Sequence, residues 1–414
     1  MFVDSVQEWC RHITEDDYAL NKLEQEKFDV ALVDPTFSNC RYLIPHRLQI
    51  PWISYAVVAN PDLVRVPWLP SFVPGPLLTF SDKMTFVERL KNAAGSLIIL
   101  FVSKRYFPEP PHEVLERFRR YGHFSSLDEL ASKSAMWFLT TDHLVDYSRP
   151  TMPNMVSIAG LTVRRSTGKL AADIRNFIDG AEKGVILVTF GSMFSAMPHD
   201  VVEKFSSAFG RLDGYGVIWR LNNRDGVKLP DNVLIARWLP QTDILAHPSL
   251  KLFVTHCGNN GQYEAVHHGV PMIGFPVFGD QFHNAGRLDH KGFGLSMNIR
   301  DFSADQLLAN IHKILRDKSY KERVVKASEI FRSQAQSPME RAAFWIEHVC
   351  RFGGDHLRSA GNDLPMYSYL MLDVLAFFVI ACLIVICVLF TLLKFIMSKC
   401  CERTTSNNSL KKDE

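Results

Sequence analysis

The chain has 414 residues, 47% of them hydrophobic, and its formal net charge of +2 is almost neutral. This length accommodates two soluble domains and one additional segment, while the dispersed Lys and Arg residues argue against a nucleic-acid-binding protein. The eight cysteines lack the spacing of a zinc site. Because a disulfide framework is unusual in a chain this large, we expect free thiols, with palmitoylation as the alternative for Cys400 and Cys401.

The first half of the chain predicts an irregular α/β domain. Short apolar runs predict strands over 28–34, within 50–58 and over 136–140. Longer amphipathic patterns predict helices over 82–107, 110–121 and 127–133. A proline-rich loop occupies 66–76, and a linker is predicted from 152 to about 180. Three strands are too few to cover these helices, so we expect an incomplete domain.

The second half alternates apolar strands with helices. Strands are predicted over 184–190, 217–221, 251–255, 270–275 and 294–299. Helices are predicted over 199–212, 261–268 and 280–291, with three more within 303–352. Apolar strands that alternate with helices predict a parallel sheet covered on both faces. Ligands of such sheets bind beyond the carboxyl ends of the strands, which is where the glycine turns and polar residues of this chain cluster.

A run of twenty uncharged residues, Val374–Leu393, lies near the carboxyl end. As a helix it would span roughly 30 Å, the thickness of a bilayer core, whereas a buried soluble helix rarely stays apolar on every face. Five Lys or Arg residues follow the run, but only Arg358 lies in the twenty residues before it. The positive-inside rule therefore predicts a transmembrane helix with a cytoplasmic tail. The pair Lys411 and Lys412 resembles the dilysine retrieval signal of endoplasmic-reticulum membrane proteins.

The opening residues, Met1–Cys10, have no basic start, no long apolar run and no small-residue cleavage site. They therefore do not have the pattern of a signal peptide. Since a protein with its main domain in the lumen requires one, we expect the amino-terminal part to be missing from this chain.

Three short segments hold the chemistry that a nucleotide sugar requires: 238–247, 253–264 and 276–281. In the first, Trp238 has a flat indole that can stack on a base, although core packing is the alternative for a tryptophan after a strand. In the second, Glu264 can accept hydrogen bonds from both hydroxyls of a ribose, although an exposed helix acid is the alternative. These two residues form a candidate nucleoside site.

The turn that begins at His256 is a candidate phosphate site, because the amino-terminal amides of the following helix suit a diphosphate. The histidine can add a donor where charge accumulates on a departing phosphate. The pair Asp280 and Gln281 follows the next strand and can grip two vicinal sugar hydroxyls. For Asp280, capping of the helix that follows is the alternative, and the two roles are compatible.

The order of these motifs resembles that of the animal membrane-bound UDP-glycosyltransferases, which include the UDP-glucuronosyltransferases. The resemblance runs from about Phe28 to the end, includes the helix motif Met84–Lys91 and the tail anchor, and is strongest over Trp238–Gln281. It implies a GT-B type α/β fold with two Rossmann-like domains, the first incomplete, and a C-terminal transmembrane helix. The implied segments are an acceptor-side domain, a UDP-sugar-binding domain, a closing helix with juxtamembrane residues, the transmembrane helix and the cytoplasmic tail, over 1–165, 166–337, 338–366, 367–396 and 397–414.

The resemblance also implies which residues bind the donor. They are Gly191, Ser192, Trp238, Gln241, His256, Gly258, Asn260, Glu264, Asp280 and Gln281. Trp238 and Gln241 would hold the uracil and Glu264 the ribose, while the strand-end turns hold the diphosphate and the acid–amide pair holds the hexose. Many relatives have glycine where this chain has Cys257, so we expect the thiol to crowd the phosphate turn.

Catalysis in this family uses a histidine as general base, oriented by an aspartate. Asp34 matches the aspartate, but the matching histidine should lie well upstream, in a region that this sequence does not have. Neither His12 nor His46 follows an apolar strand, so neither replaces it. No cofactor or metal is implied, because the remaining histidines do not pair with acids at ligand spacing and there is no Asp-x-Asp element.

The predicted function is transfer of glucose or glucuronic acid from a UDP-sugar to a hydroxyl of a small lipophilic acceptor, with inversion and without a metal. The alternative is a truncated, non-catalytic UDP-sugar-binding paralogue or partner subunit, and either a homo-oligomer or a hetero-oligomer is open. The apolar stretch Ser96–Val102 would line the acceptor side, touch the membrane or pack in a core. The predicted location is the endoplasmic-reticulum membrane, with a single span and the main domain in the lumen.

Overall fold

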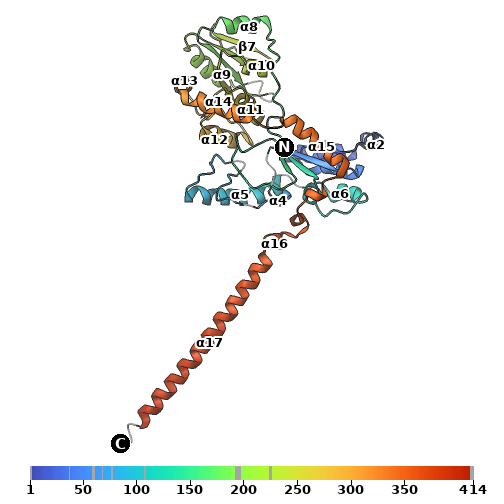
Figure 1. Ribbon diagram of the computed structural model, residues 1–414, viewed down its shortest axis with the longest axis vertical. Coiled ribbons are helices and arrows are strands. Elements are labelled where there is room, and N and C mark those ends of the chain that lie inside the picture. The colour runs from blue at the N-terminus through green and yellow to red at the C-terminus, as the bar shows by residue number, and fades with distance from the viewer. Residues whose placement is uncertain are drawn as a thin grey trace. The chain divides into compact units, whose positions relative to one another are not determined.

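The computed structural model describes residues 2–36, 38–57, 61–67, 69–75, 78–106, 109–191, 197–222 and 226–410. The chain divides into two compact units, Met1–Arg358 and Ser359–Glu414. The first unit contains two parallel sheets surrounded by helices, and the second is dominated by one long helix (Figure 1).

The first sheet has four parallel strands in the order β1-β2-β3-β4. The strands are β1 (Ala31–Val33), β2 (Trp52–Ala56), β3 (Met136–Leu139) and β4 (Met155–Ser157). The first three fall inside the predicted runs. The fourth corrects the sequence analysis, because it lies in the segment that we predicted to be a linker. The same predicted linker also contains the helix α8 (Ala172–Asp179).

Helices α1 to α7 belong to this first part of the chain. They are α1 (Phe2–Glu15), α2 (Asp17–Gln25), α3 (Leu43–Leu48), α4 (Pro61–Val64), α5 (Phe86–Tyr106), α6 (His112–Arg119) and α7 (Leu127–Ser132), with the 3-10 helix η1 (Asn39–Tyr42) before α3. Several of them contribute to one buried cluster with β1 and β2, which includes Leu20, Tyr42, Phe118 and Leu130. The three predicted helices correspond to α5, α6 and α7.

A disulfide bond joins Cys10 of α1 to Cys40 of η1. The prediction of free thiols is therefore wrong for these two cysteines, both of which are buried. A cross-link that closes a loop of thirty residues is expected to stabilise the fold by about 3 kcal/mol, mainly by restricting the unfolded chain. Cys257, Cys350, Cys382 and Cys387 are free thiols.

The second sheet has six parallel strands in the order β10-β9-β8-β5-β6-β7. They are β5 (Gly184–Thr189), β6 (Tyr215–Arg220), β7 (Val233–Ala236), β8 (Leu250–Thr255), β9 (Met272–Gly274) and β10 (Gly294–Ser296). Five of them match the predicted strands, and β7 was not predicted. The strand order reverses direction between β5 and β8, and parallel sheets bind ligands at such a switch point.

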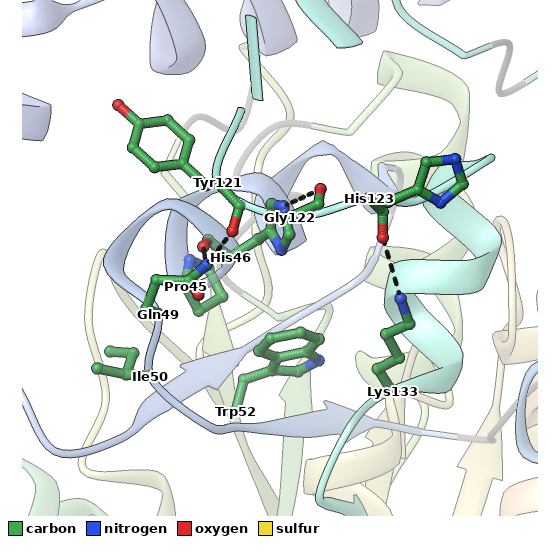
Figure 2. Close-up of a pocket in the computed structure, with 9 residues that line it drawn as sticks. All are labelled: Pro45, His46, Gln49, Ile50, Trp52, Tyr121, Gly122, His123 and Lys133. Carbon is green, nitrogen blue, oxygen red and sulfur yellow. Dashed lines mark hydrogen bonds between the residues drawn. The ribbon is translucent and has the colours of Figure 1, made fainter. Parts of the chain in front are cut away.

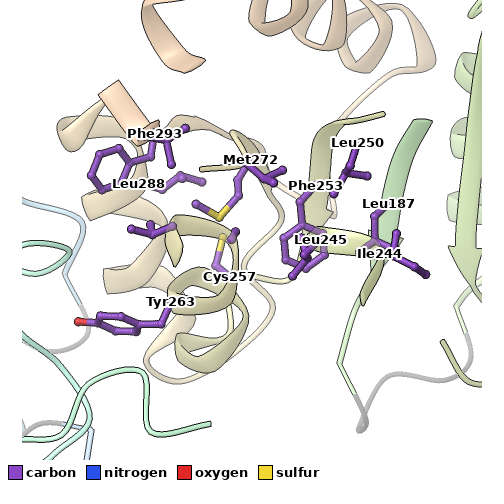
Figure 3. Close-up of a cluster of buried hydrophobic side chains, with 14 of the residues drawn as sticks. Leu187, Ile244, Leu245, Leu250, Phe253, Cys257, Tyr263, Met272, Leu288 and Phe293 are labelled. Atoms are coloured by element: carbon purple, nitrogen blue, oxygen red, sulfur yellow. The ribbon is translucent and has the colours of Figure 1, made fainter. Parts of the chain in front are cut away.

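Helices cover both faces of the second sheet. On one face lie α9 (His199–Phe209) and α13 (Ala304–Arg316). On the other face lie α8, α10 (Gln241–Leu245), α11 (Asn259–His267), α12 (Gln281–Lys291) and α14 (Lys318–Arg332). Side chains alternate between the two cores along β5, with Leu187 in one and Ile186 in the other. Figure 3 shows part of the core on the face covered by α11 and α12, where Phe253 and Leu187 lie on the strands and Tyr263 lies on α11.

Helix α15 (Pro338–Phe352) returns from the second sheet to the first. Its residues Ala342 and Val349 are buried in a cluster with Ile53, Met136 and Phe138 of β2 and β3. A capping box at Ser337 begins this helix. The two sheets are therefore joined by a helix at the end of the unit as well as by the chain between β4 and β5.

Helix α5 presents an apolar face to solvent. Its exposed apolar side chains are Phe86, Val87, Leu90, Leu97 and Ile98, which share one side of a helix. The opposite side carries Asn92, which is fully buried and donates to the carbonyls of Pro70 and Val73. Core packing is therefore wrong for the described part of the stretch Ser96–Val102. The acceptor-side and membrane-contacting alternatives stay predictions.

The second unit contains the short helix α16 (Met366–Tyr369) and the long helix α17 (Leu372–Leu410). Within α17, Leu372–Met397 is long and apolar enough to cross a membrane, as the sequence predicted. The two lysines of the proposed retrieval signal, Lys411 and Lys412, lie outside the described residues.

Candidate functional site

The candidate site lies at the carboxyl ends of three neighbouring strands of the second sheet. β5 ends at Thr189, β8 at Thr255 and β9 at Gly274, and these strands are adjacent in the order β9-β8-β5. Gly191 and His256 follow β5 and β8 within two residues, whereas Trp238 and Gln241 follow β7. Ser192, which the sequence analysis placed among the donor residues, lies outside the described residues.

His256 follows β8, and its imidazole lies between two glycines. A Cβ atom at Gly191 would come within 2.7 Å of the ring, and a Cβ atom at Gly258 within 2.5 Å. Neither position can therefore carry a side chain without displacing the histidine, and Gly191 also adopts a positive φ of 72°. Burial lowers the pKa of His256 to about 4, although the carboxylate of Asp280 opposes this shift. The imidazole is consequently neutral at pH 7.

The amino terminus of α11 follows the histidine and has no side-chain cap. Gly258 occupies the N-cap position without a side-chain hydrogen bond to the first turn. Asn260, on that turn, is exposed. The first amides of a helix have no intrahelical partner and carry partial positive charge. This turn is therefore suited to an anion such as a diphosphate.

Cys257 does not crowd this turn, contrary to our expectation. Its φ is 64°, in the left-handed region that favours glycine, and its side chain is fully buried. The thiol points into the core beside Met272 and Leu288 (Figure 3), and a Cβ atom at Gly274 would collide with its sulfur.

The residues predicted to hold the nucleoside lie together. Gln241, the first residue of α10, accepts a hydrogen bond from Thr189 Oγ1 (2.9 Å) and donates its amide to Glu264 Oε2. Thr242 Oγ1 donates to the other oxygen of Glu264 at 3.0 Å. Burial raises the pKa of Glu264, whereas the bonds from Thr242 and Gln241 oppose the shift. The carboxylate is thus partly buried, not the exposed helix acid of the alternative interpretation.

Trp238 is 73% exposed, so core packing is wrong for this residue. The guanidinium of Arg220 lies 5.0 Å from the centre of its ring, which holds one face of the indole. Arg220 Nη1 also donates to the carbonyl of Gly191 at 2.6 Å, and its Nε donates to Arg237 O at 3.1 Å. Arg220 ends β6 and was not predicted as a site residue from the sequence. An arginine that ends a strand next to the switch point was the available signal.

Asp280 and Gln281 are held in different ways. Asp280 occupies the N-cap position of α12 but makes no side-chain cap, so the capping alternative is wrong. Its Oδ2 accepts from Asn284 Nδ2 at 2.8 Å. Gln281 is 4% exposed, and its Oε1 accepts from the amides of Val277 (2.9 Å) and Phe278 (3.2 Å). The side-chain oxygen of Gln281 is therefore already occupied, and its amide nitrogen is the atom that remains to contact a ligand.

Asp34 follows β1 at the carboxyl end of the first sheet. Its side chain is half exposed, Oδ1 accepts from the amide of Thr36 at 2.8 Å, and Oδ2 lies 3.5 Å from Arg41 Nη1. The two histidines considered for its partner have other contacts. His46 Nε2 hydrogen-bonds to the carbonyl of Gly122 at 3.1 Å, and His12 lies 3.9 Å from Glu8 on α1.

His46 also lines a cavity of about 350 Å³ between α3, the loop after α6 and the end of α7 (Figure 2). Trp52, which begins β2, forms another wall. The cavity is therefore at the amino-terminal end of the first sheet, the end opposite to Asp34. Lys133 Nζ binds the carbonyl of His123 there at 3.4 Å. None of the predicted donor residues lines this cavity.

Comparisons with known proteins identify the family of this chain. The family model described as "UDP-glucoronosyl and UDP-glucosyl transferase" matches residues 1–407. The chain belongs to this family.

Curated UDP-glucuronosyltransferases match this family member over almost all of its length. UDP-glucuronosyltransferase 1A9 of Homo sapiens is 33% identical over 403 residues, which are 95% of this chain and 72% of that protein. UDP-glucuronosyltransferase 2B14 of Oryctolagus cuniculus is 35% identical over 391 residues, covering 91% of this chain and 72% of that protein. UDP-glucuronosyltransferase 1-2 of Rattus norvegicus is 32% identical over 409 residues, covering 96% and 75%.

Two solved structures support the fold of this family member. The glycotransferase of kitacinnamycin has a TM-score of 0.57 at 21% identity, covering 81% of this chain and 82% of the other. The spinosyn forosaminyltransferase SpnP has a TM-score of 0.58 at 17% identity, covering 84% and 82%. The predicted fold class is confirmed: a GT-B type α/β protein with a long apolar helix at the C-terminal end.

Proposed function

We propose that this chain transfers a hexosyl group, glucose or glucuronic acid, from a UDP-sugar to a hydroxyl of a small lipophilic acceptor. One observation carries the proposal: His256 lies between Gly191 and Gly258 beside the uncapped amino terminus of α11. That arrangement offers backbone amides and a neutral imidazole to a diphosphate. The relatives reported above are all named as UDP-glucuronosyltransferases.

In the proposed reaction the acceptor oxygen attacks the anomeric carbon from the face opposite to UDP. The bond from that carbon to the phosphate oxygen breaks, so the configuration inverts, and the hydroxyl proton passes to a general base, which the family resemblance implies to be a histidine oriented by an aspartate. Negative charge gathers on the departing diphosphate, where His256 and the amides of α11 stabilise it. Asp34 keeps its proposed role as the acid that orients the base.

The remaining donor contacts follow from the same placement. Uracil would stack on the face of Trp238 that Arg220 does not cover, and the ribose would reach Glu264 beside Gln241. The hexose would lie near Asp280. No metal is needed in this proposal, because the positive helix terminus takes the place of a divalent ion. Among the described residues, no three His, Cys, Asp or Glu side chains form a metal-binding group.

We further propose that the main domain is luminal and that α17 anchors it in the endoplasmic-reticulum membrane. The disulfide between Cys10 and Cys40 supports the luminal side, because such bonds form and persist in oxidising compartments. Protease protection tests this: in sealed microsomes an epitope at the carboxyl end should be cleaved and the main domain should survive. Cleavage of the main domain in intact vesicles would refute the orientation.

The transferase is tested with the full chain purified from membranes in detergent. UDP-glucuronic acid and UDP-glucose are each incubated with a panel of phenols, with and without EDTA, and glycosides are measured by mass spectrometry. The proposal expects a β-linked product from an α-linked donor and no effect of EDTA. Failure to bind UDP would refute it. Saturable UDP binding without any product would instead favour the non-catalytic alternative, which the named relatives do not support.

A further inference from the structure

Buried polar side chains from both sheets meet beneath the amino terminus of α11. The loop that follows β3 contributes Thr140 and Asp146, whereas α11 and α12 contribute Asn259, Gln262, His283 and Arg287. Each of these six residues is at most 7% exposed. Buried polar groups are costly unless they are hydrogen-bonded, so their placement here requires specific partners.

Arg287 of α12 is the centre of this cluster. Its Nη2 donates to Asn259 Oδ1 at 2.6 Å, and its Nε donates to Gln262 Oε1 at 2.8 Å. Its Nη1 lies 3.9 Å from Asp146 Oδ2. One planar guanidinium thus joins two positions of α11 to the loop after β3, a geometry that the single ammonium of lysine does not reproduce.

Asn259 carries the contact on to the first sheet. It is the first residue of α11, and its Nδ2 donates to the carbonyl of Thr140 at 2.9 Å. Both ends of its side-chain amide are therefore occupied, one by Arg287 and the other by the first sheet. The residue does not need to touch a ligand in order to fix the helix terminus that offers its amides to one.

The charge of Asp146 keeps Arg287 in place. Burial opposes ionisation of this carboxyl, but the hydrogen bond with His283 and the charges of Arg149 and Arg287 hold its pKa below the ordinary value. His283 Nε2 lies 2.9 Å from Asp146 Oδ1, and Arg149 Nη2 lies 2.7 Å from Oδ2. His283 and Asp146 form a histidine–carboxylate pair whose side chains are only 3% and 1% exposed, as expected of a structural pair.

A close backbone approach also holds α12 against the first part of the chain. A Cβ atom at Gly286 of α12 would come within 2.7 Å of the carbonyl oxygen of Thr79. Helix α12 therefore lies directly on the segment before α5. The part of α11 that carries Glu264, the candidate ribose ligand, is held independently. Glu264 accepts hydrogen bonds from Gln241 and Thr242 of α10. A change at Arg287 should thus shift the first turn of α11 more than the second.

We propose that Arg287, acting through Asn259, is a positioning residue for the diphosphate of the donor. It fixes the first turn of α11 against the loop after β3, so that the phosphate cradle is completed by the first sheet. This inference rests on the proposed function, since it concerns the same UDP site. It predicts a defect confined to the phosphate end of the ligand.

The test compares UDP with uridine, which lacks the phosphates, on the purified full chain. Arg287→Met removes the guanidinium, and Asn259→Leu removes the amide that it holds. Each should raise the Kd for UDP about tenfold, as for one badly placed buried hydrogen bond, and leave the Kd for uridine unchanged. The double variant should be no worse than the stronger single variant, because both act through one contact.

Two further variants keep the test decisive. Arg287→Lys retains a positive charge beside Asp146, guards against loss of the fold, and should recover part of the UDP affinity. Arg341→Met is the matched control: Arg341 of α15 donates to the carbonyls of Ser157 in β4, at 2.8 Å, and of Gln336 rather than to α11. It should leave both affinities unchanged.

Each outcome decides the proposal. An unchanged UDP affinity in folded variants of Arg287 and Asn259 would overturn it, and so would an equal loss for UDP and uridine, which indicates general loosening. If Arg287→Met does not fold, Arg287→Lys and Asn259→Leu decide instead. A wild-type chain that binds no UDP would overturn the proposed function, whereas wild-type binding with unaffected variants overturns this inference alone.

Discussion

The carboxyl ends of the two sheets hold their polar residues in different ways. At the second sheet, His256 fits between two glycines, and Gln241 bonds to Glu264. At the first sheet, Asp34 is half exposed and is bonded to its own turn and to Arg41. Residues that fix one another favour a preorganised binding site. The difference teaches that the candidate donor residues of the second sheet are held more firmly than Asp34, the aspartate that the proposed function assigns to proton transfer.

The largest effect is expected from removal of His256. His256→Ala should lower kcat by about 10²–10³-fold, as expected when one group that stabilises the leaving charge is lost. Steady-state kinetics with varied UDP-sugar measure the effect. His199→Gln, at an exposed histidine that faces Glu203 on α9, should leave kcat unchanged. Equal activity of the His256 variant and the wild type would contradict the assignment.

Loss of the disulfide between α1 and η1 should lower the stability of the fold without weakening UDP binding. Cys10→Ser is expected to lower the free energy of unfolding by about 3 kcal/mol, because it releases a thirty-residue loop in the unfolded chain. Chemical denaturation measures this, and Cys350→Ser, which removes an exposed free thiol, is the control. UDP affinity at 25 °C should be unchanged. A parallel loss of UDP binding would mean that the disulfide also holds the candidate donor site in place.

Two exposed tryptophans allow a matched test of the nucleoside site. Trp238 lies under Arg220 at 5.0 Å, and Trp9 of α1 lies under Arg41 at 4.5 Å. Trp238→Ala should weaken UDP binding by about 1–3 kcal/mol, the range for base stacking on an aromatic ring. Trp9→Ala should have no effect on UDP. Titration calorimetry gives both values, and similar losses in the two variants would remove Trp238 from the site.

The role of Asp34 is tested by Asp34→Asn, which keeps an oxygen for the amide of Thr36 but removes the charge. If this residue orients the base, kcat should fall about tenfold, a modest effect for such a pair because the carboxylate is half exposed. The Kd for UDP should not change. A variant with full kcat would show that Asp34 only closes its turn and pairs with Arg41.

The smallest expected effect concerns pH. The pKa of His256 is about 4 in the folded chain because of burial, below the ordinary value of about 6.5. Between these values the unfolded chain binds a proton that the folded chain does not, so stability falls as pH decreases. The loss from pH 7.5 to 5.5 should be about 1 kcal/mol greater in the wild type than in His256→Gln. Identical pH profiles would contradict the lowered pKa.

Much of the second sheet could be predicted from the sequence, for a physical reason. Strands buried on both faces are continuous apolar runs, as in β5 and β8. The short strand β4 escaped prediction because its three residues are only partly buried and owe their conformation to pairing with β3. The candidate donor residues were predicted from their residue types, their spacing and the family resemblance. Their mutual contacts, such as Gln241 with Glu264, depend on the fold.

Other features leave no local signal. The bond between Cys10 and Cys40 depends on η1 approaching α1, which no spacing rule reports. The buried direction of Cys257 follows from its positive φ rather than from its side chain. Arg287 looks like an ordinary helix cation until α11 and the loop after β3 are in place around it.

The most direct measurement is an experimental structure of the full chain with UDP bound. The account predicts uracil against Trp238, the ribose at Glu264, and the diphosphate between His256 and the first turn of α11. Nucleotide density elsewhere, for example in the cavity beside Trp52 and Lys133, would contradict it. So would a bound UDP whose phosphates face away from His256.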